Sequence, residues 1–464
     1  MISTTSASEI AAICQDATQG TKALKTSSDK EVAAFLTAIA DGLTAAIDTL
    51  VPIAMEESNL PEARLRGEVG RTTGQLKMFA ADVESGRWKN ETSVEALPDR
   101  QPLPRPALHR AHLPIGPVAV FGASNFPFAF SVAGGDTASA LAARCAVVVK
   151  AHPAHIKTSE AVGNIVEEAA KSCGLPASVF TLINTDAQGA QTLVKDPSIK
   201  AVGFTGSQTV GRLLMDLAAS RKDPIPVFAE MGSINPSFML PGALQQRAEA
   251  IATGYSQSLT AGVGQFCTNP GLVIGAVGND WDLFCSTVQN TLANTGPQKM
   301  LHEGISKSYL SLTEERLSTS GVSTLVKPTE AGSPGLARVD SATYTSNRTL
   351  HDEVFGPFGL FVECSTTDEF QEIASNLEGQ LTATIHHGPG DEELVKQLAS
   401  ILEDKVGRLI FNQYPTGLEV CDAIQHGGPY PAASDARFTS VGNHAILRWL
   451  RPICYQNKPE FLGL

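Results

Sequence analysis

The stretch PVAVFGASNFPFAF, residues 117–130, opens a region in which short apolar runs alternate with helical patterns. Further runs of the same kind are CAVVVK (145–150), VFTLIN (179–184), KAVGFTG (200–206) and PVFAEMG (226–232). The patterns between them predict helices near residues 131–143, 156–172, 188–195 and 208–219. Because strands that alternate with helices build a parallel sheet covered on both faces, this region predicts an α/β fold.

Polar side chains stand at the points where four of these strands are expected to end. They are Asn125, Lys150, Ser207 and Glu230. Ligands of parallel α/β sheets bind beyond the carboxyl ends of the strands. We therefore expect these four residues to face a ligand site.

The sequence before this region predicts a helical layer and then a connector. Helical periodicity covers residues 27–57, with only Gly42 and Pro52 as interior breakers, and a second helix is expected over residues 63–84. Prolines recur from residue 98 to residue 114 and predict an extended, helix-free connector. Such a connector should lie on the surface or reach toward a partner subunit.

The sequence after Ile234 predicts a second α/β unit. A helix is expected near residues 243–259, and later apolar runs predict strands at LVIGAV, GLFVEC, LTATIHH and RLIFN. The tail from about His426 is rich in Gly, Pro and Ser, so we expect it to end without a terminal helix.

Composition narrows the class of protein. With 464 residues, 42% hydrophobic and 18% charged, the chain is long enough for two or three globular domains. It has no apolar run of the length of a membrane span and no secretory signal, so we expect a cytoplasmic protein without a membrane partner. The net charge of −13 argues against nucleic acid as a partner. The eight cysteines include no CxxC pair, so we expect reduced thiols and no metal site.

Cys267 lies in GVGQFCTNPG, residues 262–271. Small residues on both sides let the backbone approach a ligand closely, and the turn that follows can aim N–H groups at one point. This setting suits a thiolate nucleophile beside an oxyanion site. A single free cysteine is nevertheless more often a small buried hydrophobe, so the segment alone leaves both interpretations open.

Three other segments carry a chemical interpretation and a structural alternative. Glu230 has the position of a general base at a strand end, but it could equally cap a helix or form a surface ion pair. Asn125 could donate to an oxyanion or simply occupy a turn. GFTGSQTVG, residues 203–211, could cradle a pyrophosphate or form an ordinary tight turn, because it is not a GxGxxG motif.

Taken in order, these segments resemble the motifs of the aldehyde dehydrogenase superfamily along nearly the whole chain. The matching segments are SNFP (124–127), VVVK (147–150), FTGS (204–207), AEMG (229–232), GQFC (264–267) and EVFGP (353–357). The resemblance implies that Cys267 attacks an aldehyde and that Asn125 and the Cys267 N–H hold the oxyanion. Glu230 would then activate the water that hydrolyses the thioester. Cofactor contacts are implied for Lys150, His152, Gly206, Ser207, Gly232, Glu353 and Phe355.

The resemblance also implies a domain organisation. We expect an aldehyde dehydrogenase-like α/β fold with a Rossmann-like cofactor domain, a catalytic α/β domain and a small oligomerisation element in a homodimer or homotetramer. The expected boundaries are 1–97 for the helical part of the cofactor domain, 98–115 for the connector, 116–232 for the NAD(P)-binding domain, 233–425 for the catalytic domain and 426–464 for the C-terminal return.

The chain departs from the family pattern at a few points. Ser124 stands where the family commonly has Trp, and Ser233 stands where it commonly has a second Gly. The chain also begins late and stops early relative to many members, which leaves the oligomer contacts open. None of these departures removes a reacting group.

The resemblance extends to the choice of cofactor. NAD-selective relatives often place a Glu three residues after the ribose lysine, where this chain has Pro153. The local segment KAHPAH contains no acid, so we expect a preference for NADP, with NAD as the alternative.

The substrate is expected to be a short aldehyde with an anionic end. The segments at residues 60–80, 121–143 and 427–442 are similar to the branch that oxidises 2-oxoglutarate semialdehyde, which also includes an NADP-dependent fatty aldehyde dehydrogenase. An apolar passage is expected from Phe126, Phe130 and Phe266, with Arg71 or Arg437 as the carboxylate partner. Both arginines could instead be solvated or form structural ion pairs.

Two alternatives remain at this point. A CoA-acylating relative would use the cysteine but would not need a water-activating base, so the presence of Glu230 argues against it. A structural protein on the same scaffold would have no need to keep Cys267, Glu230 and Asn125 together.

Overall fold

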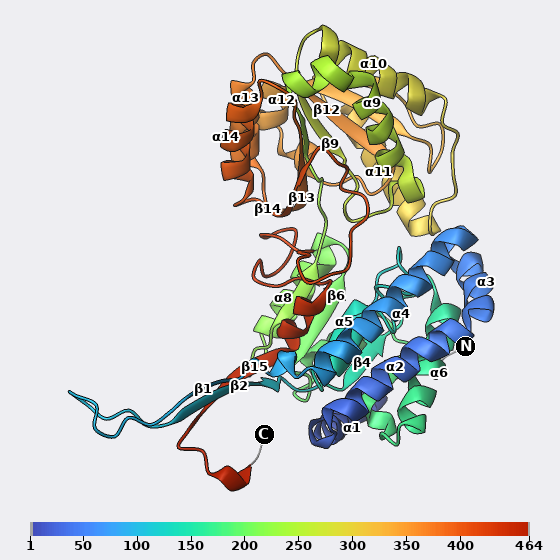
Figure 1. Ribbon diagram of the computed structural model, residues 1–464. Coiled ribbons are helices and arrows are strands. Elements are labelled where there is room, and N and C mark those ends of the chain that lie inside the picture. Colours follow the sequence, from blue (N-terminus) through green and yellow to red (C-terminus); the bar gives the residue numbers. More distant parts are fainter. Residues whose placement is uncertain (1–2, 463–464) are drawn as a thin grey trace.

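Two parallel sheets, one in each half of the molecule, dominate the computed structural model, which describes residues 3–462 (Figure 1). The first sheet has the order β5-β4-β3-β6-β7, and all its strand pairs are parallel. Its strands are β3 (Val118–Phe121), β4 (Val147–Lys150), β5 (Phe180–Ile183), β6 (Ala201–Thr205) and β7 (Val227–Glu230). This is the Rossmann order, in which successive strands are added first on one side of β3 and then, from β6, on the other, so that a ligand crevice opens between β3 and β6.

Helices cover both faces of this sheet, as the alternating pattern predicts. They are α5 (Gly135–Ala142), α6 (Ile156–Ser172), α7 (Ala187–Lys195) and α8 (Gln208–Ala219). Val118 and Val120 point into the core shared with α5 and α6, whereas Ala119 and Phe121 point into the core shared with α7 and α8. Because every strand is apolar on both faces, the sheet is buried on both sides.

The second sheet has seven strands in the order β10-β11-β12-β9-β8-β13-β14, and β10 alone pairs antiparallel. Its strands are β8 (Ser237–Met239), β9 (Leu272–Ala276), β10 (Ser323–Val326), β11 (Gly335–Asp340), β12 (Phe358–Cys364), β13 (Gln380–His386) and β14 (Val406–Phe411). The helices packed against it are α9 (Pro241–Thr260), α10 (Asn279–Ala293), α11 (Glu303–Ser318), α12 (Ser341–Ser346), α13 (Asp368–Asn376) and α14 (Glu392–Leu402). The predicted second α/β unit is therefore present.

The N-terminal layer differs from its prediction in two respects. The continuous pattern over residues 27–57 folds as two helices, α2 (Asp29–Ala45) and α3 (Ile47–Ser58), which are bent by 73° at Ala46. A preceding helix, α1 (Ala7–Thr26), was not predicted, although Ser6 and Glu9 form a capping box at its start. The second predicted helix is confirmed as α4 (Glu62–Glu84).

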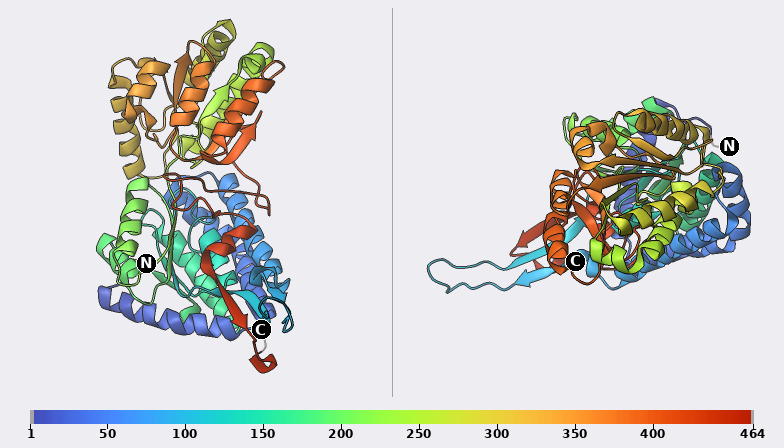
Figure 2. Two further views of the ribbon diagram at one scale, coloured as in Figure 1. Left: turned by 90° about the vertical axis from the view of Figure 1, so that its left-hand side faces the viewer. Right: turned by 90° about the horizontal axis from the view of Figure 1, so that it is seen from above.

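The proline-rich connector forms part of a projecting arm (Figure 2). Its strands β1 (Thr92–Val94) and β2 (Leu108–Pro114) pair antiparallel, and β15 (Leu450–Gln456) from the C-terminal segment pairs with the other edge of β2. Among the described residues, the tail contains no α-helix after α14. Short 3₁₀ helices complete the fold: η1 (Arg87–Lys89), η2 (Ala177–Val179), η3 (Ala261–Gly264), η4 (Arg348–His351), η5 (Asn443–Trp449) and η6 (Glu460–Leu462).

Within residues 3–462 no single helix is long and apolar enough to cross a membrane. The bent pair α2 and α3 passes that test only when the two are taken together.

Candidate active site

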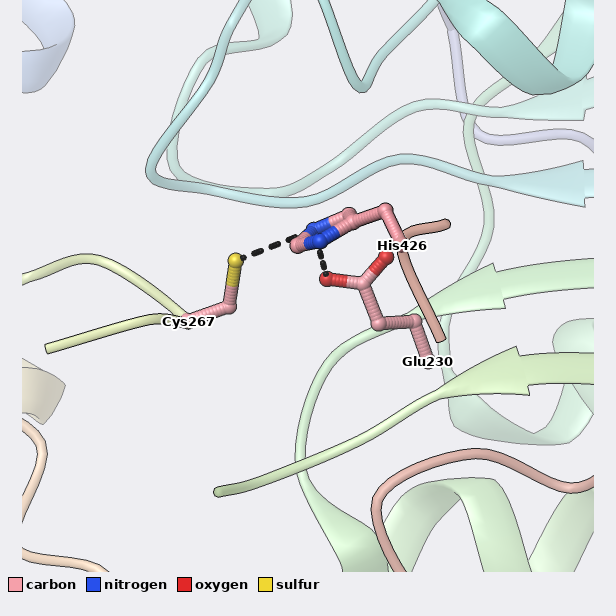
Figure 3. Close-up of side chains that lie close together, drawn as sticks. All are labelled: Glu230, Cys267 and His426. Carbon is pink, nitrogen blue, oxygen red and sulfur yellow. Dashed lines mark hydrogen bonds and ion pairs between the residues drawn. The ribbon is translucent and has the colours of Figure 1, made fainter. Parts of the chain in front are cut away.

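Three side chains from distant parts of the sequence meet between the two sheets (Figure 3). Glu230 ends β7, Cys267 precedes β9, and His426 lies in the tail after β14. His426 Nε2 lies 3.4 Å from Cys267 Sγ and 2.9 Å from Glu230 Oε1. Glu230 and His426 are 3% and 1% exposed, whereas Cys267 is partly exposed, so a substrate can reach the sulfur but not the pair behind it.

The backbone before Cys267 adopts an unusual conformation that fixes the sulfur. Gly262, Val263 and Gly264 all have left-handed φ values, of 54°, 59° and 64°. For a β-branched residue such as Val263 this conformation is strained. A Cβ on Gly264 would lie 2.3 Å from the carbonyl carbon of Gly356, so only glycine fits there. The segment is thus held against the loop that follows Glu353.

Side-chain amides of three asparagines donate hydrogen bonds to backbone carbonyls in and around the same segment. Asn235 Nδ2 donates to the Cys267 carbonyl over 2.9 Å, and Asn269 Nδ2 donates to the Gly356 carbonyl over 3.1 Å. The Asn125 side chain is buried, and its Nδ2 donates to the Gln265 carbonyl over 3.1 Å. Asn125 therefore lies beside the backbone that carries the sulfur, where an amide can also reach an oxyanion.

Charged groups of both signs act on the ionisation of the Cys267 thiol. Burial, together with the carboxylate of Glu230, raises the pKa of the Cys267 thiol well above its usual range, and the Arg71 guanidinium partly offsets this. Burial alone would also raise the pKa of Glu230, but His426 and the Ser440 hydroxyl, which donates to Oε2 over 2.6 Å, bring that pKa below its usual value. Glu230 is thus a carboxylate, and the thiol needs a proton acceptor next to it. The Glu230 carboxylate, which also contacts the thiol, and His426 Nε2 are both in that position.

The expected phosphate turn follows β6 and fits a dinucleotide. Gly206 and Ser207 are exposed, and the Ser207 hydroxyl caps α8 by accepting from the Val210 N–H over 3.4 Å. The start of α8 therefore presents backbone N–H groups beside the crevice between β3 and β6. Lys150 ends β4 and is partly buried, and burial lowers its pKa.

Asp186 acts on Lys150 although it lies outside the segment KAHPAH, which contains no acid. Its negative charge raises the pKa of the Lys150 amine, against the effect of burial. Asp186 caps α7 through a hydrogen bond from the Gly189 N–H over 2.9 Å, so it is anchored at this end of β5.

His152 is also beside Lys150. Its ring stacks on His155 at 5.3 Å, and burial lowers the pKa of His152 to about 3, so it is neutral at neutral pH. Its Nδ1 accepts from the Ala154 N–H over 3.1 Å, which leaves the proton on Nε2. His152 can therefore offer one neutral donor to a cofactor but no positive charge.

The other implied cofactor residues lie in two segments, one after β7 and one before β12. Glu353 is partly exposed, and a Cβ on Gly232 would lie 2.6 Å from Glu353 Oε2, so the two segments are in contact. Burial raises the pKa of Glu353 to about 8. Phe355 is partly buried in the same loop. A carboxyl of this kind can accept hydrogen bonds from ribose hydroxyls.

The aromatic residues expected to line the substrate passage come together. Phe126 lies with its ring centroid 5.3 Å from that of Phe130 and 5.6 Å from that of Phe266. Phe130 in turn lies 6.2 Å from the His426 ring, so the aromatic group reaches the reacting residues. Arg71 stacks on this group, with its guanidinium carbon 5.1 Å from the Phe130 centroid.

Arg437 is not part of this group. Its side chain is 80% exposed, forms an ion pair with Asp435 at 2.5 Å, and stacks on Phe438. A neighbour two residues away satisfies its charge, so the structure does not place Arg437 where a substrate carboxylate would need it. Of the two arginines considered from sequence, only Arg71 lies beside the passage.

Several site residues were missed in the sequence. His426 directly precedes GGPYPAASDARFTSVG, but a single histidine in a glycine-rich tail carries no motif signal. Ser440 was missed for the same reason. Arg64 lies seven residues before Arg71 on the same helix, a spacing that the sequence does show.

Ser233, one of the departures from the family pattern, has a structural explanation. Its hydroxyl donates to Gln380 Oε1 over 2.9 Å and accepts from the Leu381 N–H over 3.0 Å. The serine therefore ties the segment after Glu230 to β13.

By distance alone, Glu230, Cys267 and His426 could also hold a metal ion, since their ligand atoms all lie within 4.8 Å of one another. No metal site was predicted there, because the three residues come from separate segments of the sequence.

Comparison with known proteins identifies the family of this chain. The model of the aldehyde dehydrogenase family matches residues 1–295. The chain belongs to the aldehyde dehydrogenase family. The resemblance inferred from the six ordered motifs is therefore confirmed, as is the prediction of an oxidoreductase that uses NAD(P).

Two relatives are particularly similar. The α-ketoglutaric semialdehyde dehydrogenase 2 of Azospirillum brasilense is 48% identical over 438 residues, which cover 93% of this chain and 83% of the relative. The α-ketoglutaric semialdehyde dehydrogenase of Acinetobacter baylyi is 44% identical over 419 residues, which cover 89% of this chain and 80% of the relative.

Solved structures confirm the fold class. The glyceraldehyde-3-phosphate dehydrogenase GapN from Methanocaldococcus jannaschii, in complex with NADP, matches with a TM-score of 0.81 at 19% identity, over 98% of this chain and 95% of that one. Aldehyde dehydrogenase 21 from Physcomitrella patens, in complex with its product succinate, matches with a TM-score of 0.80 at 20% identity, over 98% and 92%. The aldehyde dehydrogenase-like α/β fold is thus confirmed.

Proposed function

We propose that this aldehyde dehydrogenase oxidises 2-oxoglutarate semialdehyde to 2-oxoglutarate through a thioester on Cys267. The observation that carries the chemistry is the contact of His426 Nε2 with both Cys267 Sγ and Glu230 Oε1. The observation that carries the substrate is the 48% and 44% identity to two α-ketoglutaric semialdehyde dehydrogenases over most of both chains.

The first step forms the carbon–sulfur bond. The paired Glu230 carboxylate and His426 ring take the proton of the Cys267 thiol. The sulfur attacks the aldehyde carbon, and the carbonyl oxygen becomes an oxyanion. The Asn125 amide and the Cys267 backbone N–H hold that charge.

The second step converts this adduct to a thioester and requires a hydride acceptor. Lys150, His152 and the turn at Gly206 and Ser207 would hold one end of a nicotinamide cofactor, while Gly232, Glu353 and Phe355 would hold the other. When bound, NAD(P)⁺ would supply the acceptor for a hydride from the substrate carbon.

The third step releases the acid. Glu230, with His426 beside it, takes a proton from water as the water oxygen attacks the thioester carbon. The proton taken from the thiol in the first step passes to solvent before this step, so the base is free. The carbon–sulfur bond breaks, and the proton taken from water goes to the sulfur. This role for a base distinguishes hydrolysis from transfer of the acyl group to CoA.

We propose NADP as the preferred cofactor, with NAD as the alternative. Pro153 replaces an acid that would repel a 2′-phosphate, and the neutral His152 leaves an Nε2 donor beside Lys150. Asp186 opposes this preference, because it places a negative charge near the same amine.

The projecting arm supports a proposal for assembly. Leu103, at the tip of the connector, is 69% exposed, and β1 is exposed along its length. We propose that the arm formed by residues 98–115 and the C-terminal segment contacts a partner subunit in a homodimer or homotetramer. Light scattering after size exclusion tests this, with a monomer as the contradicting result.

A substrate panel tests the proposed function. With NADP and then with NAD, catalytic efficiency is measured for 2-oxoglutarate semialdehyde, hexanal and decanal. The proposal predicts the highest kcat/KM with the semialdehyde and release of free acid without added CoA. A higher value with hexanal or decanal would replace it with a fatty aldehyde dehydrogenase.

A further inference from the structure

Three charged residues form one stripe along α4. Arg64, Glu68 and Arg71 are spaced by four and then three residues, so their side chains share one face of the helix. This face points toward the loop that follows β3, because Glu68 Oε1 accepts from the Phe128 N–H over 2.7 Å and from the Ala129 N–H over 2.9 Å. One oxygen of the carboxylate between the two arginines is therefore engaged by backbone. The other, Oε2, is buried without a hydrogen-bond partner, and burial raises the pKa of Glu68 above its usual value.

The two guanidinium groups retain unused donors. Arg71 Nε and Nη2, and Arg64 Nη1, are buried and have no hydrogen-bond partner. Within residues 3–462 no carboxylate forms a salt bridge with either group. Arg64 Nη2 does donate to the Asn125 carbonyl over 2.6 Å, which fixes that guanidinium beside the oxyanion residue. A buried donor without a partner is costly, so this arrangement suits an anionic ligand.

Aromatic rings hold both groups in place. The Arg64 guanidinium carbon lies 4.7 Å from the Phe266 centroid and 5.0 Å from that of Phe126. The Arg71 carbon lies 5.5 Å from Phe126 and 5.1 Å from Phe130. Stacking of this kind orients a guanidinium without using its N–H groups.

The stripe also lies close to the nucleophile. Phe266 directly precedes Cys267, and the Phe130 ring lies 6.2 Å from that of His426. The positive charge of Arg71 is felt at Cys267 and at Glu230. A short aldehyde bound to the sulfur would therefore have its far end among these rings and arginines.

We propose that Arg71, supported by Arg64, binds the carboxylate of the substrate and selects aldehydes that carry an anionic end. The free Nε and Nη2 atoms of Arg71 form the side of the guanidinium that matches a carboxylate with two parallel hydrogen bonds. This assignment rests on the proposed function and adds the specificity residues to it. Arg64, which also stacks on Phe126, contributes one further donor, Nη1.

The first test compares two five-carbon aldehydes, 2-oxoglutarate semialdehyde and pentanal, at saturating cofactor. The readout is the ratio of their kcat/KM values, because loss of the Arg71 charge also acts on Cys267 and would lower both. Arg71→Met is expected to lower the ratio by about 30-fold or more, since charged hydrogen bonds are lost. Arg71→Lys retains the charge without the planar fork and should lower it less.

The matched control is Arg66→Met on the same helix. Arg66 pairs with Glu62 and Asp48, each at 2.8 Å, on the solvent side, so its loss should leave the ratio unchanged. An unchanged ratio in both Arg71→Met and Arg71→Lys would overturn the assignment, and the two variants together keep the test valid if one fails to fold.

The second test separates this assignment from the proposed substrate. Glutarate, a five-carbon diacid without an aldehyde, is used as an inhibitor of pentanal oxidation. We expect inhibition of the wild type that weakens about tenfold or more in Arg71→Met and persists in Arg66→Met. Absence of inhibition in the wild type would overturn the carboxylate site. If glutarate inhibits through Arg71 but pentanal is the better substrate, the site stands and the proposed semialdehyde fails.

Discussion

His426 Nε2 lies 2.9 Å from Glu230 Oε1, and the same nitrogen is 3.4 Å from the sulfur of Cys267. One ring nitrogen therefore links the expected nucleophile to the expected base. Because the pKa of the Cys267 thiol is raised, the sulfur needs an acceptor for its proton, and the Glu230–His426 pair lies beside it.

His426→Gln should slow the alkylation of Cys267 by iodoacetamide at neutral pH by about 100-fold, because the amide cannot accept the thiol proton. Cys421 and Cys454 are also exposed, so the label must be assigned to Cys267 by peptide mapping rather than by counting thiols. His444→Gln, at an exposed position, is the control. An unchanged rate at Cys267 would remove His426 from the activation step.

Glu230→Gln should form the thioester more slowly than the wild type and then stall, since His426 can still take the thiol proton while water is not deprotonated. Rapid mixing is expected to show a burst of NADPH close to one equivalent per active site, followed by a slow steady state. A steady-state rate equal to that of the wild type would show that Glu230 does not act in hydrolysis.

Glu353 makes cofactor binding depend on pH. Its carboxyl has a pKa raised to about 8, so it is largely protonated at neutral pH and ionises as the pH rises through that value. The ionised form accepts hydrogen bonds from ribose hydroxyls better, so cofactor affinity in the wild type should increase across this range. In Glu353→Gln the increase should disappear. An identical pH profile of Kd in both proteins would contradict the assignment.

The same shift affects stability in the opposite direction. The pKa of this carboxyl is higher in the folded than in the unfolded chain, so the folded chain binds more protons between the usual carboxyl range and about pH 8. The free energy of unfolding therefore decreases as the pH rises through that range. Without cofactor, Glu353→Gln should therefore lose less thermal stability than the wild type between mildly acidic and mildly alkaline pH. Parallel melting curves would argue that Glu353 is not desolvated.

Asp186 provides a test of cofactor choice. The ratio of kcat/KM with NADP to that with NAD should exceed one in the wild type. It should rise further in Asp186→Asn, because a negative charge near Lys150 is removed. Asp223→Asn, at an exposed position, should leave the ratio unchanged. A wild-type ratio below one would show that Pro153 permits either cofactor without favouring NADP.

The sequence predicted the parallel α/β regions well because their signal is local. The predicted helices at 156–172 and 208–219 have the same bounds as α6 and α8, since apolar periodicity and flanking strands define them. The bend at Ala46 was not predicted, because the periodicity on both sides is continuous and tertiary packing decides where the chain turns.

Only the site residues that lie in recognisable sequence motifs could be predicted. Cys267, Glu230 and Asn125 lie in recognisable segments and converge as expected, whereas His426 joins them from 159 residues beyond Cys267. Arg71 and Arg437 were equivalent candidates in the sequence. They differ because Asp435 satisfies one, while the other has buried donors without a partner.

In the proposed mechanism, Cys267 carries the oxidised substrate as a thioester. The most direct measurement is the intact mass of Glu230→Gln, quenched in acid after mixing with 2-oxoglutarate semialdehyde and NADP, followed by peptide mapping. The expected result is a mass gain of one 2-oxoglutaryl group, located on the peptide that contains Cys267 and absent from Cys267→Ser. An adduct on another residue, or full dehydrogenase turnover by Cys267→Ser, would contradict it.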